Sequence, residues 1–132
     1  MTDEQQTLSD WLAAQAWLVH SDPEIPAPVL AALRQVLTLG HPDSEALARY
    51  GAALSALCRF YRVTAYAHRQ MLSEVLIKLG TCSQKLFWDS VGNFMSMAPD
   101  FARLAIPAWA GALDLTADQQ QQLRTEAFHA LR

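Results

Sequence analysis

The sequence predicts an all-α fold, a compact array of about six to seven antiparallel helices that form a single domain of residues 1–132. Apolar residues recur with a period near 3.6 through almost the whole chain, and runs that alternate apolar and polar residues are absent. The 132 residues are 52% apolar, which is enough to bury a core without disulfides or metals. Short links between the helical segments favour antiparallel packing of neighbours in the chain.

The first two helices are expected on either side of a proline-rich stretch. The first runs from Asp3 to His20, and Trp17 points away from its apolar stripe. Three prolines at 23–28 interrupt the chain, and the last of them lies where a helix accepts proline, in its first turn. A second helix is therefore expected from Ala27 to Leu39, closed by Gly40.

Three helices are expected in the middle of the chain. One spans Ser44 to Tyr61, and the next spans Thr64 to Leu79 and is ended by Gly80, since glycine commonly closes helices. Ser83 is expected to cap a helix that continues to Met97. The apolar stripe of this helix consists of Phe87, Val91, Phe94, Met95 and Ala98.

The last two helices are expected after residue 99. Asp100 opens the sixth, and Pro107 inside it removes one backbone hydrogen bond and should bend it. Thr116 and Gln119 have the spacing of a capping box, which predicts that the seventh helix begins there and ends near residue 132.

Composition and charge favour a cytoplasmic protein that does not cross a membrane. The longest uncharged apolar run, Leu104 to Leu113, has about half of the roughly 20 residues that a spanning helix needs. Residues 1–25 contain five acids and no Lys or Arg, so we expect no leader peptide. Cys58 and Cys82 both lie in apolar helical patterns, and we expect two reduced, packed thiols.

The charges are unevenly distributed along a chain of net charge −3 and pI near 5.7. Six of its ten Lys and Arg residues lie between residues 46 and 85, together with one acid. This basic middle third either complements the acidic N-terminal third or faces an acidic partner, and the first interpretation is favoured because helices adjacent in sequence tend to lie side by side.

We expect no metal, no cofactor and no enzymatic activity. The four histidines are scattered without zinc-ligand spacing, and the five glycines are too far apart to form a phosphate-binding loop. Cys58 or Cys82 with His68 would supply a nucleophile and a base, but neither cysteine lies where a thiol pKa is clearly lowered, Cys82 beside the Ser83 cap being a partial exception. One enzymatic alternative stays open, a substrate or cofactor pocket between the fourth and sixth helices.

The segment from Val36 to Leu57 points beyond a general helical domain. Its helix carries Leu47, Tyr50, Gly51 and Leu54 at helical spacing, and a glycine there costs about 0.5 to 1 kcal/mol relative to alanine. We therefore expect another helix to pass too close for a Cβ atom. The segment resembles the first helix of a tetratricopeptide repeat, in which large apolar residues and a glycine recur in this order. The resemblance covers residues 36–70 and departs from the family pattern after Phe60, so it implies one divergent repeat within a different array.

The resemblance implies a concave binding face on this helix. Small side chains predominate in it, which leaves room for bulky apolar residues of a partner helix or extended peptide, and Arg49 would orient a carboxylate. The chain is also similar to small bacterial chaperones of type III secretion in size, acidity and this segment. The residues of the implied face are Glu45, Ala48, Arg49, Ala52 and Ser55.

The leading interpretation is thus a non-enzymatic adaptor or chaperone that binds another protein, with Trp17 as a further anchor if it is not packed under a helix. The alternative is a small subunit that binds nucleic acid through the basic and aromatic stretch containing Arg59, Arg62 and Arg69. The acidic pI and the lack of a recognisable nucleic-acid module argue against this alternative. A homo-oligomer with a face around Met95 is equally open, although core filling explains that residue as well.

Overall fold

The computed structural model describes residues 3–15, 25, 27–40 and 42–131, and within these ranges it contains seven α-helices and no strand. The all-α prediction is confirmed. The elements in chain order are α1 (Asp3–Gln15), α2 (Ala27–Arg34), the 3-10 helix η1 (Gln35–Thr38), α3 (Ser44–Phe60), α4 (Tyr66–Cys82), α5 (Gln84–Met97), α6 (Pro99–Leu113) and α7 (Ala117–Ala130).

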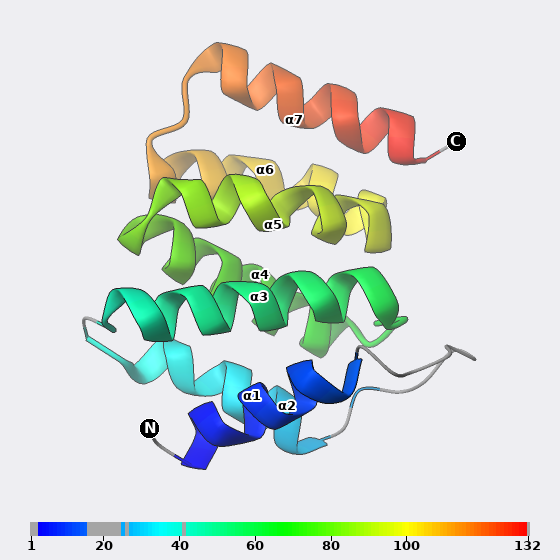
Figure 1. Ribbon diagram of the computed structural model, residues 1–132. Coiled ribbons are helices and arrows are strands. Elements are labelled where there is room, and N and C mark those ends of the chain that lie inside the picture. Colours follow the sequence, from blue (N-terminus) through cyan, green and yellow to red (C-terminus); the bar gives the residue numbers. More distant parts are fainter. Residues whose placement is uncertain (1–2, 16–24, 26, 41, 132) are drawn as a thin grey trace.

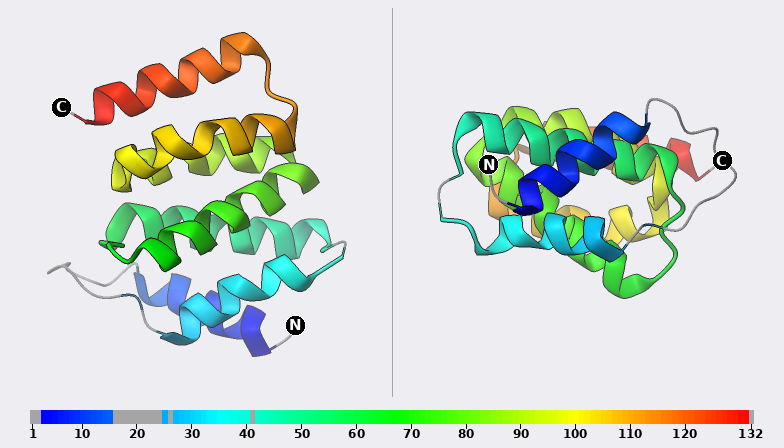
Figure 2. Two further views of the ribbon diagram at one scale, coloured as in Figure 1. Left: turned by 180° about the vertical axis from the view of Figure 1, so that it is seen from behind. Right: turned by 60° about the horizontal axis from the view of Figure 1, so that its bottom comes forward.

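The helices are stacked in two layers (Figure 1). Helices α1, α3 and α5 form one layer and run in the same direction, while α2, α4 and α6 form the other and run in the opposite direction. The three antiparallel pairs follow one another along the stack, and α7 covers its last pair by packing on α5 and α6 (Figure 2). The described ends of the chain therefore lie at opposite ends of the stack, and each helix packs mainly on the neighbouring pairs.

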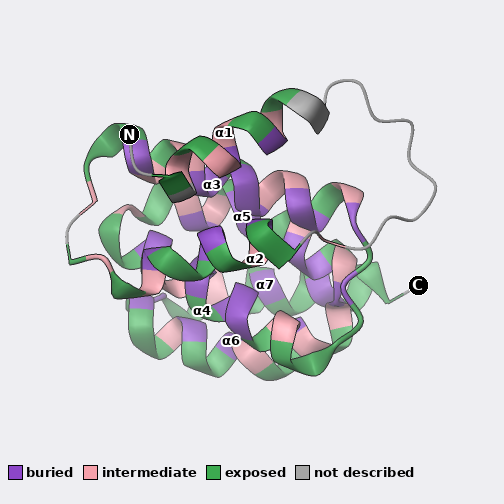
Figure 3. Cartoon of the chain, turned by 90° about the horizontal axis from the view of Figure 1, so that it is seen from below, coloured by how far each residue is buried: buried purple, intermediate pink, exposed green. Residues whose placement is uncertain are grey.

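The core runs along the stack between the layers, where the buried segments face inward (Figure 3). Trp109 of α6 is fully buried and donates a hydrogen bond from Nε1 to Ser73 Oγ of α4 at 2.9 Å. Its ring meets those of Phe87 and Phe94 in α5 edge to face, with centroids 5.7 and 5.6 Å apart. A single side chain thus joins α4, α5 and α6, and the hydrogen bond satisfies two buried polar groups at once.

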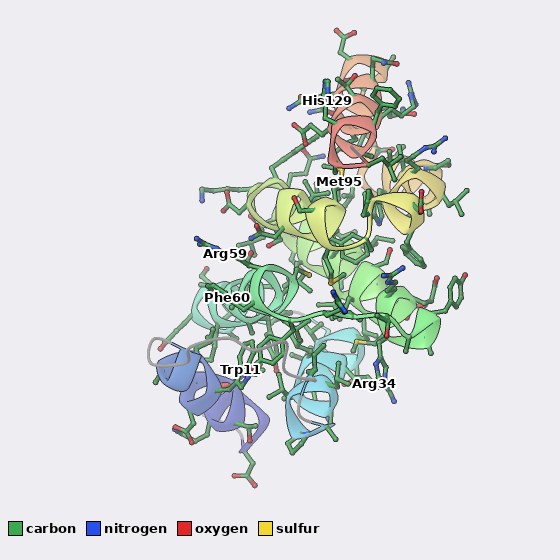
Figure 4. The ribbon with its side chains drawn as sticks, turned by 90° about the vertical axis from the view of Figure 1, so that its right-hand side faces the viewer. Trp11, Arg34, Arg59, Phe60, Met95 and His129 are labelled. Atoms are coloured by element: carbon green, nitrogen blue, oxygen red, sulfur yellow. The ribbon has the colours of Figure 1, made fainter. Side chains whose placement is uncertain are left out.

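A second buried hydrogen bond joins the first helix to the rest of the stack. Trp11 of α1 donates from Nε1 to the Tyr61 hydroxyl at 3.2 Å, and the two rings lie 5.6 Å apart. Figure 4 shows Trp11 pointing from α1 toward the interior of the stack.

The apolar stripe that the sequence predicts for α5 is confirmed as well, because all five of its members are buried.

The predicted end of α4 is wrong. The helix does not stop before Gly80 but continues through it to Cys82. A Cβ atom at Gly80 would lie 3.0 Å from Phe87 Cβ and 2.9 Å from Leu113 Cδ2. Glycine is used here because α5 and the end of α6 approach the helix closely, and not because the chain must leave the helix.

Smaller differences concern other helix ends. The segment expected as the end of the second helix forms the 3-10 helix η1. Helix α4 begins at Tyr66, after a non-helical segment that contains Val63 and Thr64, whose β-branched side chains disfavour helix. Ser83 precedes α5 but makes no capping hydrogen bond through its side chain. The expected part of the first helix beyond residue 15, including Trp17, lies outside the described residues. Helix α6 continues through Pro107 to Leu113.

The capping box predicted for the last helix is confirmed. Gln119 donates its backbone N–H to Thr116 Oγ1 at 3.1 Å, and Thr116 donates its backbone N–H to Gln119 Oε1 at 2.9 Å. Two donors that a helix N-terminus leaves unpaired are thereby satisfied, which fixes where α7 begins. Among the described residues, no helix has both the length and the apolar character needed to cross a membrane.

Candidate functional site

The face implied by the repeat resemblance lies along α3, and its residues are largely available to solvent. Ala48 and Ala52 are exposed. Arg49 is half-buried and pairs with the exposed Glu45 one turn earlier, with Nη2 and Oε1 3.3 Å apart. The guanidinium expected to orient a partner carboxylate thus already has a carboxylate within its own helix.

Ser55, at the end of this face, is turned toward α5. Its hydroxyl lies 2.9 Å from that of the buried Ser90, and the Asn93 side-chain amide donates to the Ser55 carbonyl at 3.5 Å. The α3 face therefore ends in polar contacts with the next helix of its layer, and Ser55 stabilises the stack there. Ala48 and Ala52 remain its small, open positions.

The expected close approach at Gly51 is confirmed in part. A Cβ atom at this position would lie 3.2 Å from Leu86 Cδ2 of α5, so α5 is close, but the contact is with the end of a flexible side chain that a small shift would move. Gly51 itself is buried, so the glycine lies on the side of α3 that packs on α5, and the small exposed alanines lie elsewhere on the same helix.

The three arginines of the nucleic-acid alternative have different roles. Arg59 and Arg62 line one hollow of about 430 Å³, together with Asn93 and Ser96 of α5. Arg69 instead donates from Nε to the Val63 carbonyl at 2.7 Å and so holds the turn before α4. Figure 4 shows Arg59 directed away from the stack at the end of α3.

The cysteines do not form a nucleophile–base pair. Cys58 is buried, and desolvation raises its thiol pKa to about 12, so the thiol is protonated at neutral pH. Cys82 is exposed, which makes the prediction of a packed thiol wrong at this position. Cys82 is the last residue of α4, and the two residues that follow Gly80 in this helix are both exposed to solvent. Within the described ranges, no group of three His, Cys, Asp or Glu side chains is placed to hold a metal ion.

A further hollow of about 480 Å³ lies between α5 and α7. Trp88, Val91 and Gly92 line it from α5, and Gln119, Gln122 and Glu126 line it from α7. A Cβ atom at Gly92 would meet nothing within 4 Å, so packing does not require glycine there. The absence of a side chain at this position widens the hollow.

The most apolar exposed surface is on the opposite layer, around Leu104. The Leu104 side chain on α6 is 84% exposed, Tyr66 on α4 is 71% exposed, and Phe128 on α7 is 55% exposed. Scattered apolar residues are common on protein surfaces, but a contiguous group at a hollow is typical of an interaction site.

Leu104 belongs to two adjoining hollows, which we call together the Leu104 surface. The first has about 190 Å³ and lies between α4 and α6, where the fourth and sixth helices were expected to enclose a pocket. The second has about 450 Å³ and lies between α6 and α7. The first is lined by Tyr66, Gln70, Ser73, Glu74, Ile77, Phe101, Leu104, Ala105 and Ala108, and the second by Arg103, Leu104, Arg124, Phe128 and Leu131.

Aromatic packing holds part of the first hollow in place. The Phe101 ring lies edge to face with Tyr66 at 5.5 Å and with the fully buried Phe94 at 5.9 Å. Tyr66 is thus supported through Phe101 by the core. The hollow has a fixed apolar wall although its rim is exposed.

The sequence interpretation did not identify the Leu104 surface, although the sequence contains a signal for it. The buried stripe of α6 is Ala102, Ile106, Trp109 and Leu113, and Leu104 lies off this stripe. Phe128 lies off the stripe formed by Leu123 and Ala127 in the same way. One large apolar residue outside the buried stripe on each of two consecutive helices is the sequence pattern that could have indicated the Leu104 surface.

Two other expectations have different outcomes. Met95 is buried (Figure 4), so the interpretation as core filling holds for this residue, and a homo-oligomer stays a prediction. Trp17 lies outside the described residues. Comparison of the chain with protein-family models, with curated proteins and with solved structures finds no match.

Proposed function

We propose that this chain is a non-enzymatic adaptor or chaperone of the cytoplasm, which binds a helical or extended segment of another protein at the Leu104 surface. The observation that carries the proposal is the 84% exposure of Leu104 where two hollows adjoin. A leucine side chain gains about 1.5 to 3 kcal/mol when it is moved fully from water into an apolar contact.

The α3 face is the competing location for the partner. Ala48 and Ala52 offer room but little apolar area, because each contributes only a methyl group. Leu104, Tyr66 and Phe128 contribute large exposed side chains, and Tyr66 is supported by the Phe101 ring. Since large apolar and aromatic side chains dominate binding energy at interfaces, the Leu104 surface is the better candidate.

Two substitutions separate the locations. Leu104→Asp places a charge in the Leu104 surface, and Ala52→Arg fills the α3 face; both side chains are exposed, so neither should change the urea midpoint much. Each variant would be used to recover partners by affinity purification, followed by quantitative mass spectrometry. Loss of the enriched partner with Leu104→Asp alone supports the proposal. Loss with Ala52→Arg alone moves the site to α3, and unchanged recovery with both contradicts a binding role for either surface.

The second candidate function is nucleic-acid binding at the hollow between the ends of α3 and α5. The specific observation is that Arg59 and Arg62 line one hollow beside Asn93 and Ser96. This function requires oligonucleotide affinity that falls steeply with salt, because phosphate contacts release counterions, and that is lost in Arg59→Glu. A salt-independent response or unchanged binding by Arg59→Glu dismisses it.

A further inference from the structure

We infer that the partner segment at the Leu104 surface is an amphipathic helix whose apolar side chains are flanked by acidic residues, an inference that rests on the proposed function. The charges of the hollow between α6 and α7 carry it. The two charged residues that line this hollow, Arg103 and Arg124, are both basic and both exposed.

Neither arginine is neutralised within the described part of the chain. Arg103 makes no ion pair there, and Arg124 uses Nε and Nη2 to bond the amide oxygen Gln121 Oε1, at 3.3 and 3.2 Å. Two unpaired cations thus lie beside exposed Leu104, Phe128 and Leu131. Carboxylates on both sides of an apolar stripe would meet these cations while the stripe fills the hollow.

The adjoining hollow extends the same partner helix toward α4. Its wall is apolar, with Phe101 and Ile77 among its residues, and its one charged residue is Glu74. Glu74 makes no ion pair with another described residue. A partner helix that carries its acidic residues over α7 and lacks them over α4 therefore suits both hollows. This distribution of charge sets which part of the partner helix lies over α7 and which part lies over α4.

A second copy of this chain suits the surface less well. A twofold contact centred on the hollow between α6 and α7 would bring Arg103 and Arg124 close to the same two residues of the copy. Like charges placed together in an apolar contact oppose association. An anionic membrane also attracts arginines, but two adjoining hollows fit side chains that protrude from a helix better than they fit a flat lipid surface.

The test uses two fluorescein-labelled synthetic peptides of about 20 residues with the same leucine stripe, one flanked by Glu and the other by Lys. Fluorescence anisotropy with the full chain should give roughly tenfold tighter binding of the Glu peptide in dilute buffer. The difference should disappear at about 1 M salt, where the Debye length is about 3 Å. Equal binding of the peptides, or binding of neither, overturns the inference.

Variants then assign the preference to the two arginines. Arg103→Glu combined with Arg124→Glu should reverse the order of the two peptides. The matched control combines Arg34→Glu with Lys85→Glu, which changes the same charge at exposed positions on α2 and α5, and it should retain the preference for Glu. Reversal by the control as well would show that net charge alone acts, which contradicts a site at the Leu104 surface.

Leu104→Asp distinguishes this inference from the proposed function. If Leu104→Asp abolishes peptide binding while the double Arg variant leaves the peptide order unchanged, the surface binds a partner but the acidic partner is wrong. If Leu104→Asp leaves binding unchanged, the proposed site itself is wrong. Concentration-dependent dimerisation that is lost in Leu104→Asp, or binding to anionic phosphatidylserine vesicles in place of the peptides, would assign the surface to one of the other occupants and overturn the inference.

Discussion

Gly80 and Gly92 occupy helix interiors for opposite reasons, and the difference lies in what surrounds them. A methyl group at residue 80 would press on Phe87 Cβ at 3.0 Å, an atom fixed close to the backbone of α5. A methyl group at residue 92 would enter open space beside α7. The same substitution should therefore change stability in opposite directions.

We expect Gly80→Ala to lower the free energy of unfolding by roughly 1 to 3 kcal/mol, because overpacking outweighs the gain in helix propensity. Gly92→Ala should raise it by roughly 0.5 to 1 kcal/mol through helix propensity alone. Urea denaturation followed by circular dichroism measures both values. Destabilisation by Gly92→Ala would mean that residue 92 has a close neighbour in solution.

The Cys58 thiol links stability to alkaline pH. Its pKa in the folded chain, about 12, is above the value near 8.5 of an exposed thiol, so the folded state retains the proton longer than the unfolded state. The stability that depends on this thiol is fully present below pH 8.5 and is lost as the pH rises toward 12. At pH 10 the loss should be about 2 kcal/mol.

Cys58→Ala is the reference for this loss, since alanine does not titrate. The unfolding free energy of each protein would be measured in urea at pH 7 and pH 10. Wild type should fall by about 2 kcal/mol more than the variant over this interval. Parallel changes in both proteins would contradict a buried, neutral thiol at residue 58.

At the scale of elements, the beginning of α7 depends on side-chain capping, whereas the beginning of α5 does not. Thr116 accepts from the Gln119 backbone, but Ser83 is shared between the end of α4 and the start of α5 and makes no such bond. Helix α7 also contributes Arg124 and Phe128 to the Leu104 surface. A weakened start of α7 should therefore affect both stability and binding.

Thr116→Ala should lower the free energy of unfolding by about 1 kcal/mol, and Ser83→Ala, the matched control, should change it by much less. Both values come from urea denaturation. Thr116→Ala should also accelerate amide exchange in α7 before it does so in α4 or α5. Equal effects of the two substitutions would contradict the capping box.

Much of the arrangement of helices along the chain was predictable from the sequence. Helix positions follow from the apolar period, and the start of α7 follows from Thr116 and Gln119. The end of α4 was not predictable, because Gly80 reads as a helix terminator by itself and its role depends on Phe87 and Leu113. The local capping signal fixes the start of α7, but a glycine has two uses that only its neighbours in space distinguish.

For the whole molecule, a stack in which each helix pair packs mainly on adjacent pairs should open from its ends. Helices α3, α4 and α5 have neighbours on both sides, whereas α7 is covered on one side alone (Figure 1). Hydrogen exchange followed by mass spectrometry should show the slowest amides in α3 to α5 and faster ones in α7. Uniform protection from α3 to α7 would instead indicate a fully cooperative unit.

The sequence by itself determined the all-α class, the order of the helices and the buried stripe of α5, because a period of 3.6 is a local property of the chain. Only the tertiary structure decided which apolar residues outside the stripes stay uncovered. Leu104 and Trp109 belong to the same apolar run, yet Leu104 is 84% exposed and Trp109 is fully buried. The reason is that α4, α5 and α7 all pack on α6 but leave Leu104 uncovered between them, and which residues a neighbouring helix covers depends on contacts between residues far apart in the chain.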